Sequence, residues 1–222
     1  AARLFGIMGG KEIKLPAAKP VKGLTFAILK TVAMEHVVDL PKKAFRNSID
    51  KLEKAGAIIS EISVSSVKEA MDLTGFLYSP EAYATWKHKI EKSPDLMFEK
   101  ILERFRSGAD ILASDFICAW QKLLVLRQQY HLEVGAYDAV LIPTSPIIPP
   151  ELGRLMSNGD FYNSQNLLAL RNTRIGNLMG GCSITLPTNI PSCGLLIMGR
   201  PNEEERLLRL AQACELVLAG NP

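Results

Sequence analysis

The sequence predicts an α/β fold in which helices cover a single layer of mixed β-sheet. Short apolar runs of strand length alternate with segments in which apolar residues recur every three or four positions, as in amphipathic helices. The first alternation places a strand, a helix and a second strand within residues 24–64, which is the order of a βαβ unit with parallel strands. We therefore expect a mixed sheet, with helices packed over it.

The composition is that of an ordinary globular protein. The chain has 222 residues, of which 47% are hydrophobic and 22% charged, and its formal net charge is +3 at pH 7. Acids interrupt the basic residues, as in Lys51-Leu52-Glu53-Lys54, and this pattern indicates solvated helix faces rather than a nucleic-acid-binding surface. Because no apolar run reaches the length of a membrane span and none resembles a signal peptide, we expect a cytoplasmic protein.

Cysteine and histidine indicate neither a disulfide framework nor a metal site. The four cysteines lie far apart and form no C-x-x-C pair, and the three histidines are also scattered. A glycine-rich phosphate loop is missing too. We therefore expect reduced, partly buried thiols and no metal or other cofactor.

Local signals predict the elements of the first third of the chain. Residues 1–22 comprise a helical pattern with no N-cap residue before it and a connection rich in Lys, Pro and Gly, so we expect the natural protein to extend further toward the N-terminus. Residues 24–29 have the length and composition of a strand. A helix is expected between Asp39 and Gly56, since glycine suits the position that follows a helix.

The middle of the chain is predicted to be mostly helical. After a second strand at residues 57–64, apolar residues recur three or four apart through most of residues 67–130. Pro80 and Pro94 are expected to separate helices within this stretch. Residues 139–143 form a continuous apolar run, which is typical of a buried parallel strand.

The last third is predicted to contain a loop, a hairpin and a helix. Prolines, glycines and asparagines are frequent in residues 147–166 and indicate a long loop. Two short strands, at residues 182–186 and 195–199, flank a hairpin-like connection. Asn202 is expected to cap a final helix that carries glutamates in its first turn, where carboxylates suit the helix dipole.

Several segments, in the right order, resemble the amidase signature family, which hydrolyses carboxamides and includes the A subunit of the aminoacyl-tRNA amidotransferases. Residues 137–146 match the family's YDalLtPTtP strand, and Leu-Glu-Lys-Ala-Gly-Ala at residues 52–57 is similar to its helix–AGA–strand piece. Residues 172–187 resemble fT.p.NlaGlPaisvP, and residues 194–201 resemble GlqiiGrp. The resemblance covers nearly the whole chain and implies one region, residues 1–222, that forms the C-terminal portion of an amidase-signature fold.

The resemblance also implies that the catalytic residues lie elsewhere. The family cleaves amides with a Ser nucleophile, a second Ser in a cis peptide and a Lys, which lie within a GSSGG segment and upstream of it. This sequence contains no such segment, and its Ser65-Ser66 pair is followed by valine and lysine rather than glycines. We therefore expect an inactive fragment whose partner is the missing N-terminal half of the same enzyme, or a chain that associates with itself.

By resemblance, the C-terminal half supplies one wall of a pocket for a small amide substrate. The expected pocket residues are Thr144, Ser145, Asn177 and Cys182. Each also has a plainer interpretation: Thr144 and Ser145 as caps of a strand end, Asn177 as a turn cap, and Cys182 as a packing residue.

The chain departs from the family pattern close to these positions. Gly181-Cys182 stands where the family usually carries Leu-Pro, and residues 171–174 are unusually basic. Arg171 or Arg174 would suit bidentate binding of a substrate carboxylate, with a surface arginine as the alternative. Two other functions stay open: a non-catalytic binding or assembly module with an amidase-like fold, and the A subunit of an amidotransferase, which partners a tRNA-binding protein.

Overall fold

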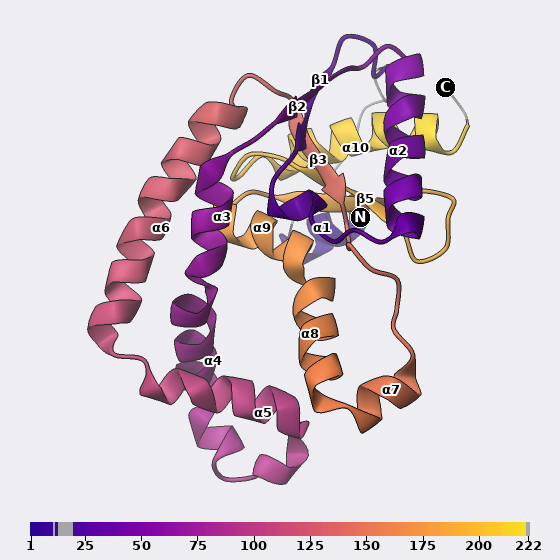
Figure 1. The fold of residues 1–222 in the computed structure, drawn as a ribbon. Helices are drawn as coiled ribbons and strands as arrows, with labels where there is room; N and C mark the ends of the chain where they lie inside the picture. Colours follow the sequence, from indigo (N-terminus) through magenta and orange to yellow (C-terminus); the bar gives the residue numbers. More distant parts are fainter. Residues whose placement is uncertain (11, 13–19, 221–222) are drawn as a thin grey trace.

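The structure, a computed structural model, describes residues 1–10, 12 and 20–220. At the centre of this part of the chain lies a five-stranded sheet with the order β2-β1-β3-β5-β4 (Figure 1). The strands are β1 Thr25–Leu29, β2 Ile58–Ile62, β3 Ala139–Pro143, β4 Ser183–Pro187 and β5 Gly194–Met198. Strand β1 pairs in parallel with β2 and β3, whereas β5 pairs antiparallel with β3 and β4. The predicted α/β class with a mixed sheet is confirmed.

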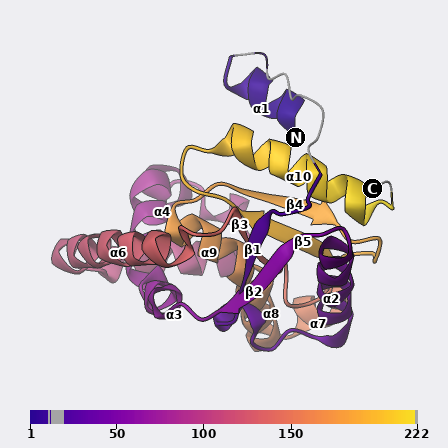
Figure 2. The same cartoon turned by 90° about the horizontal axis from the view of Figure 1, so that it is seen from above.

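Helices cover both faces of this sheet. The α-helices are α1 Ala2–Met8, α2 Asp39–Lys54, α3 Ser65–Asp72, α4 Thr74–Ile90, α5 Glu99–Arg106, α6 Ala113–Val134, α7 Leu152–Ser157, α8 Gly159–Ala169, α9 Arg171–Met179 and α10 Glu204–Leu218. The short 3-10 helices are η1 Val32–Met34, η2 Pro94–Leu96 and η3 Ser107–Asp110. In the view from above, α2 and α10 lie on one side of the sheet and α3, α6 and α9 on the other (Figure 2).

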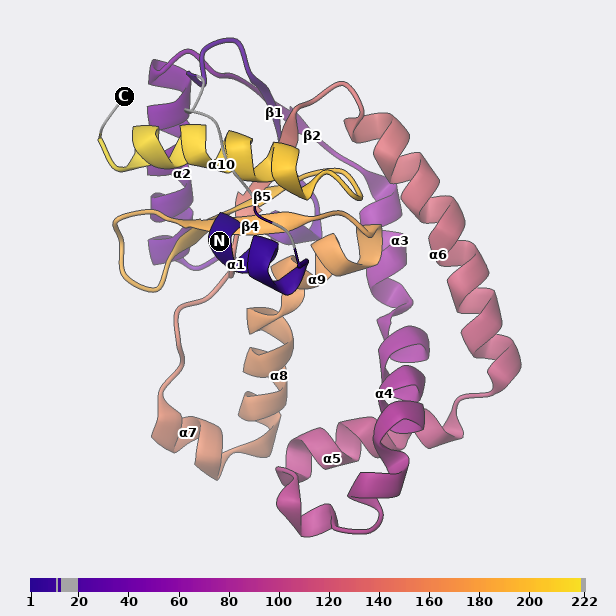
Figure 3. The ribbon, with the colours of Figure 1, turned by 180° about the vertical axis from the view of Figure 1, so that it is seen from behind.

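Strand alternation separates two hydrophobic cores. Phe26 and Ile28 of β1 pack with α2 and α10, whereas Ala27 and Leu29 pack with α3, α6 and α9. All five residues of β3 are buried, because helices lie on both of its faces. Figure 3 shows α10 running alongside β4 and β5, which it contacts. The predicted burial of β3 is confirmed, and the strand is parallel to β1 and antiparallel to β5.

The β1–α2–β2 unit follows the sequence prediction closely. Its two strands are parallel neighbours, and α2 buries one stripe that includes Phe45, Ile49 and Leu52. Gly56 follows the helix with φ of +92°, a left-handed conformation that glycine adopts without strain. The predicted N-terminal helix is present as α1, while much of the connection predicted after it lies outside the described residues.

Pro80 does not separate two helices as predicted, because α4 continues through it. Proline removes one helical hydrogen bond but does not end a helix that tertiary packing supports on either side. Here η3 packs against α4 so closely that a Cβ atom on Gly108 would collide with the Ser79 carbonyl and the Pro80 nitrogen. Pro94, by contrast, lies between α4 and α5 as predicted, at the first residue of η2.

Two predictions for the last third of the chain are wrong. Residues 147–166 are not a long loop, since they contain α7 and most of α8. Asn158 is the N-cap of α8, and its side chain accepts a hydrogen bond from the Phe161 N–H at 2.9 Å, so a residue that indicates a loop starts a helix. Asn202 does not cap α10: it is left-handed, with φ of +61°, and Glu203 occupies the N-cap position. The predicted hairpin and the acidic first turn of α10 are confirmed.

The helices that leave the sheet form two arms, which Figure 1 shows below the sheet. One arm consists of α4, η2, α5 and η3, and the other of α7 and α8, which leads into α9 against the sheet. The arms meet where the Phe98 and Tyr162 rings pack edge to face at 5.3 Å. Within the part of the chain that the structure describes, no helix is both long enough and apolar enough to cross a membrane.

Candidate functional site

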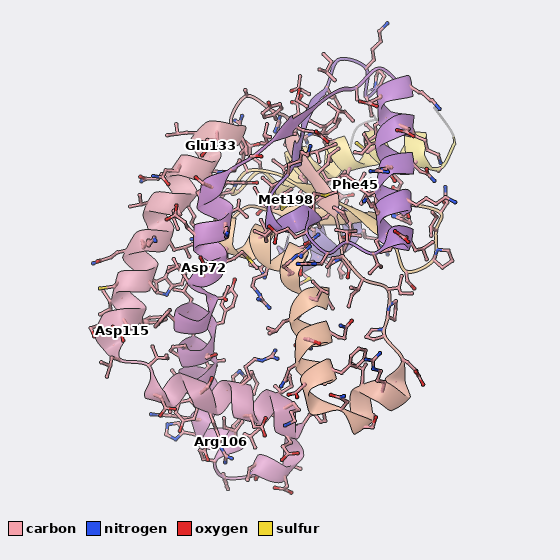
Figure 4. All side chains as sticks on the ribbon, in the orientation of Figure 1. Phe45, Asp72, Arg106, Asp115, Glu133 and Met198 are labelled. Carbon is pink, nitrogen blue, oxygen red and sulfur yellow. The ribbon has the colours of Figure 1, made fainter. Side chains whose placement is uncertain are left out.

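A pocket of about 430 Å³ lies between α4 and α5 of the first arm and helices α8 and α9. Side chains from both arms project into this space (Figure 4). Helix α4 contributes Tyr78, α5 contributes Arg104, and α9 contributes Arg174 and Asn177. The Arg104 Nη1 group donates to Asn166 Oδ1 at 2.8 Å, which joins α5 to α8 across the pocket. We call this site the arm pocket.

Helical periodicity explains how α9 serves both the core and the arm pocket. Its buried face carries Ile175 and Leu178, which are at most 1% exposed and pack against the sheet. Leu170, Arg174 and Asn177 lie four and three residues apart, so they share the other face and line the arm pocket.

The arm pocket is electropositive. Two arginines line it, and none of its lining residues carries a carboxylate. Burial lowers the pKa of the Arg174 guanidinium, with Tyr78 opposing this effect and the charge of Arg104 adding to it. Burial also raises the pKa of the Tyr78 phenol, while the charges of Arg174 and Arg127 act in the opposite direction. Such a half-buried cationic site suits an anionic group that can accept hydrogen bonds from guanidinium nitrogens.

Buried polar contacts hold the start of α9 in place. Asn172 is fully buried, and its Nδ2 donates to the Ala33 and Pro143 carbonyls at 3.0 and 2.7 Å. Arg171 donates to the Asn172 Oδ1 at 3.0 Å and to the Ala33 carbonyl at 3.1 Å. The structure therefore separates the two arginines: Arg174 faces the arm pocket, whereas Arg171 anchors the helix to η1.

The four residues predicted to line a substrate pocket occupy three different places. Asn177 lies in the arm pocket. Thr144 and Ser145 border a second, more open hollow of about 710 Å³ at the β4–β5 connection. Their hydroxyl groups have local partners there: Thr144 Oγ1 donates to Thr185 Oγ1 at 3.2 Å, and Ser145 Oγ donates to the Ile147 carbonyl at 3.0 Å.

Cys182 lies at the other end of β4. Its Sγ atom donates to the Arg200 carbonyl at 3.1 Å. Burial raises the pKa of this thiol, and the charge of Glu204 raises it further. A thiol with a raised pKa is a poor nucleophile, so these surroundings favour a packing role. Among the described residues, no group of three or more His, Cys, Asp or Glu side chains is placed to hold a metal ion.

Tyr78 and Arg104 carry no sequence signal that points to the site. Both lie in the stretch predicted to be helical, but no local motif marks either of them. Only the folding of α4 and α5 against α8 and α9 brings them to Arg174. The unusually basic start of α9 is the sequence feature that indicates this site.

Comparison with known proteins decides the family. The model of the Amidase family matches residues 8–208, which is nearly the whole chain. The chain belongs to the amidase family. It is 26% identical over 235 residues to the 2-amino-5-chloromuconic acid deaminase of Comamonas testosteroni, an alignment that covers 98% of this chain and 48% of that protein. It is also 28% identical to the A subunit of the glutamyl-tRNA(Gln) amidotransferase of Staphylococcus carnosus (strain TM300), covering 89% of this chain and 45% of the relative.

A solved structure shows the same fold. A crystal structure of an amidase superposes with a TM-score of 0.76 at 20% identity, covering 97% of this chain and 50% of that one. The chain thus spans about half the length of the amidase-family proteins that it matches. It is a member of a hydrolase family that has amidotransferase relatives.

Proposed function

We propose that this chain is the C-terminal part of an amidase-signature hydrolase that cleaves a carboxamide to a carboxylate and ammonia. In this proposal, residues 1–222 form one region that contributes sheet strands and one wall of the substrate pocket and has no turnover of its own. The observation that carries the proposal is the match of the Amidase family over residues 8–208 in a chain that spans about half of its relatives and holds no GSSGG segment.

We assign the residues that line the arm pocket to this wall of the substrate pocket. Arg104 lies on α5 of the first arm and Arg174 on α9, and Asn177 adds an amide three residues further along α9. This arrangement favours a substrate that carries a carboxylate in addition to the amide that is cleaved. The relative named 2-amino-5-chloromuconic acid deaminase acts, by its name, on an acid, which supports this substrate class.

The partner in this proposal is the other half of the same enzyme. Strands β2 and β4 are the edges of the described sheet, and each pairs with a single strand. Large apolar side chains are exposed on the arms, including Leu96 at 83% and Leu152 at 71%. Exposed strand edges and apolar surface favour either contact with the missing half or self-association when that half is absent.

Ammonia release from small amides tests the proposal. The chain alone and the chain joined to the polypeptide that its own gene encodes upstream would be assayed side by side. We expect turnover from the longer protein only. Equal activity in the isolated chain would contradict the proposal, and a longer protein without the Ser, cis-Ser and Lys residues would favour a non-catalytic binding module.

A second candidate is the A subunit of an amidotransferase, favoured by the similarity to the Staphylococcus carnosus protein. Such an enzyme would pass its ammonia to a second protein that binds tRNA. Co-purification with the longer protein distinguishes the two: a stoichiometric second polypeptide supports the amidotransferase, and an active enzyme that purifies alone supports the stand-alone amidase.

A further inference from the structure

We propose that Arg127 of helix α6 is a positioning residue for the arm pocket. It does not line the pocket but holds the last turn of α9, and through that turn it sets the position of Asn177. The inference rests on the proposed function, in which Asn177 faces the substrate.

Arg127 contacts the carbonyl end of α9, where the Asn177 carbonyl also accepts a hydrogen bond from the Gly180 N–H at 3.2 Å. The last four carbonyl groups of an α-helix have no donor within the helix, and α9 ends at Met179. The Arg127 Nε donates to the Leu178 carbonyl at 2.6 Å, and its Nη2 donates to the Asn177 carbonyl at 3.3 Å. One guanidinium therefore joins two consecutive carbonyls of the turn that carries the pocket amide.

His131 extends this arrangement by one residue. It lies four residues after Arg127, on the same face of α6, and its Nε2 is 3.0 Å from the Met179 carbonyl. Carbonyl groups 177 to 179 are thus all in contact with side chains of α6. A cation at this position also interacts favourably with the negative end of the α9 dipole.

The guanidinium group is itself held in place. It lies over the Trp120 ring, with its carbon 5.5 Å from the ring centroid. On the α9 side, Gly180 has φ of +69°, and a Cβ atom there would stand only 3.2 Å from the Arg127 Cζ. Glycine therefore allows the turn to come close to Arg127 in a conformation that other residues rarely adopt.

These contacts connect the side of α9 that faces α6 with the side that lines the arm pocket. Arg127 and His131 border a separate groove along α6, whereas the Asn177 side chain lines the arm pocket. The positive charge of Arg127 also lowers the pKa of the Tyr78 phenol in the same pocket, against the larger effect of burial. Lysine would not replace this arginine, because its ammonium group is a point charge rather than a planar fork with several donors.

Hydrogen exchange on the 222-residue chain tests the positioning itself. Arg127→Gln should speed amide exchange about tenfold in residues 177–181 and leave strand β3 unchanged, since loss of a capping interaction opens one turn locally. Lys122→Gln is the matched control, because Lys122 also lies on α6 but pairs with Glu69 at 3.1 Å, away from α9. Unchanged exchange in residues 177–181 would overturn the proposal.

Kinetics of the longer, active protein test the link to the pocket. Arg127→Gln should raise KM about tenfold with little change in kcat, and Arg127→Lys should restore only part of the loss. Gly180→Ala disturbs the same contact from the other side and should shift KM in the same direction, while Lys122→Gln should leave KM and kcat unchanged.

The outcomes separate this inference from the proposed function. A fall in kcat at constant KM would indicate a smaller folded fraction rather than a misplaced pocket wall, and would overturn the inference. Altered exchange with unchanged kinetics would also overturn it. A wild-type protein without amide hydrolysis would instead contradict the proposed function, and the exchange experiment would still decide whether Arg127 positions the turn.

Discussion

The sheet and the two arms differ in how completely their large apolar side chains are buried. In the sheet, side chains such as Leu141 and Ile197 are completely buried against α2 and α10. In the arms, large apolar side chains including Leu96 and Met156 remain exposed, and the described contacts between the arms include one ring pair and the Arg104–Asn166 hydrogen bond. The comparison shows that the candidate site lies where the less buried arms meet α9, a helix that packs against the sheet.

The substitution with the largest expected effect on the free energy of unfolding lies in the sheet. Leu141→Ala removes a fully buried side chain at the centre of β3 and would leave a cavity in the core. We expect a loss of about 3.5 kcal/mol in the free energy of unfolding. Denaturant unfolding followed by circular dichroism measures this loss. A change below about 1 kcal/mol would mean that the core is loosely packed and would remove the contrast with the arms.

A glycine pair on the first arm tests how tightly α4 and η3 pack. Gly108→Ala would place a Cβ atom against the Ser79 and Pro80 backbone, so we expect a loss of about 2 kcal/mol and displacement of Arg104 from the arm pocket. Gly75→Ala on α4 is the matched control, because a Cβ there meets no atom within 4 Å. That substitution should be neutral or slightly stabilising. Equal effects of the two changes on thermal unfolding would contradict the close packing.

The smallest expected effect on stability comes from an exposed ion pair on the same arm. Arg106 donates to Glu91 through two nitrogens, at 3.0 and 2.7 Å. The hydrogen bond with Arg106 lowers the pKa of the Glu91 carboxyl. Stability from a depressed carboxyl pKa is present above the unfolded-state pKa and is lost as pH falls through the folded-state pKa. Because both groups are exposed, the effect should be small and salt-sensitive.

Thermal unfolding of Glu91→Gln measures this contribution. The variant should melt slightly below the parent chain at neutral pH and low salt, and the difference should vanish in acid. A difference that persists at acidic pH would show that packing rather than charge accounts for it.

The same contrast explains which features could be predicted from the sequence. The sheet strands, α2 and the buried stripe of α10 follow from short-range periodicity and from glycine signals such as Gly56. The arms follow from tertiary contacts: α4 continues through Pro80 because η3 packs against it, and Asn158 starts a helix where the local composition indicates a loop. Arg104 and Arg174 are far apart in the sequence, so no local pattern could place them in one pocket.

The predicted pocket residues illustrate the same limit. Asn177 lies on the pocket face of α9, but Thr144, Ser145 and Cys182 lie near strand ends with local hydrogen-bond partners. A match to a family motif identifies the strand and its ends. It does not say which way a side chain points once the arms have folded over the sheet, and the substrate role of these residues stays a prediction.

The most direct test of the central claim compares two amides of similar size in the longer, active protein, one bearing a carboxylate and one neutral. Succinamate and butyramide form such a pair, and ammonia release reports both. We expect a preference for succinamate, and we expect Arg174→Gln to reduce kcat/KM for succinamate about tenfold while leaving butyramide nearly unchanged. Lys122→Gln, which removes an exposed cation of α6 that pairs with Glu69, would serve as the control outside the pocket. An equal loss for both amides in Arg174→Gln, or no preference in the parent enzyme, would contradict the assignment of the arm pocket to a substrate carboxylate.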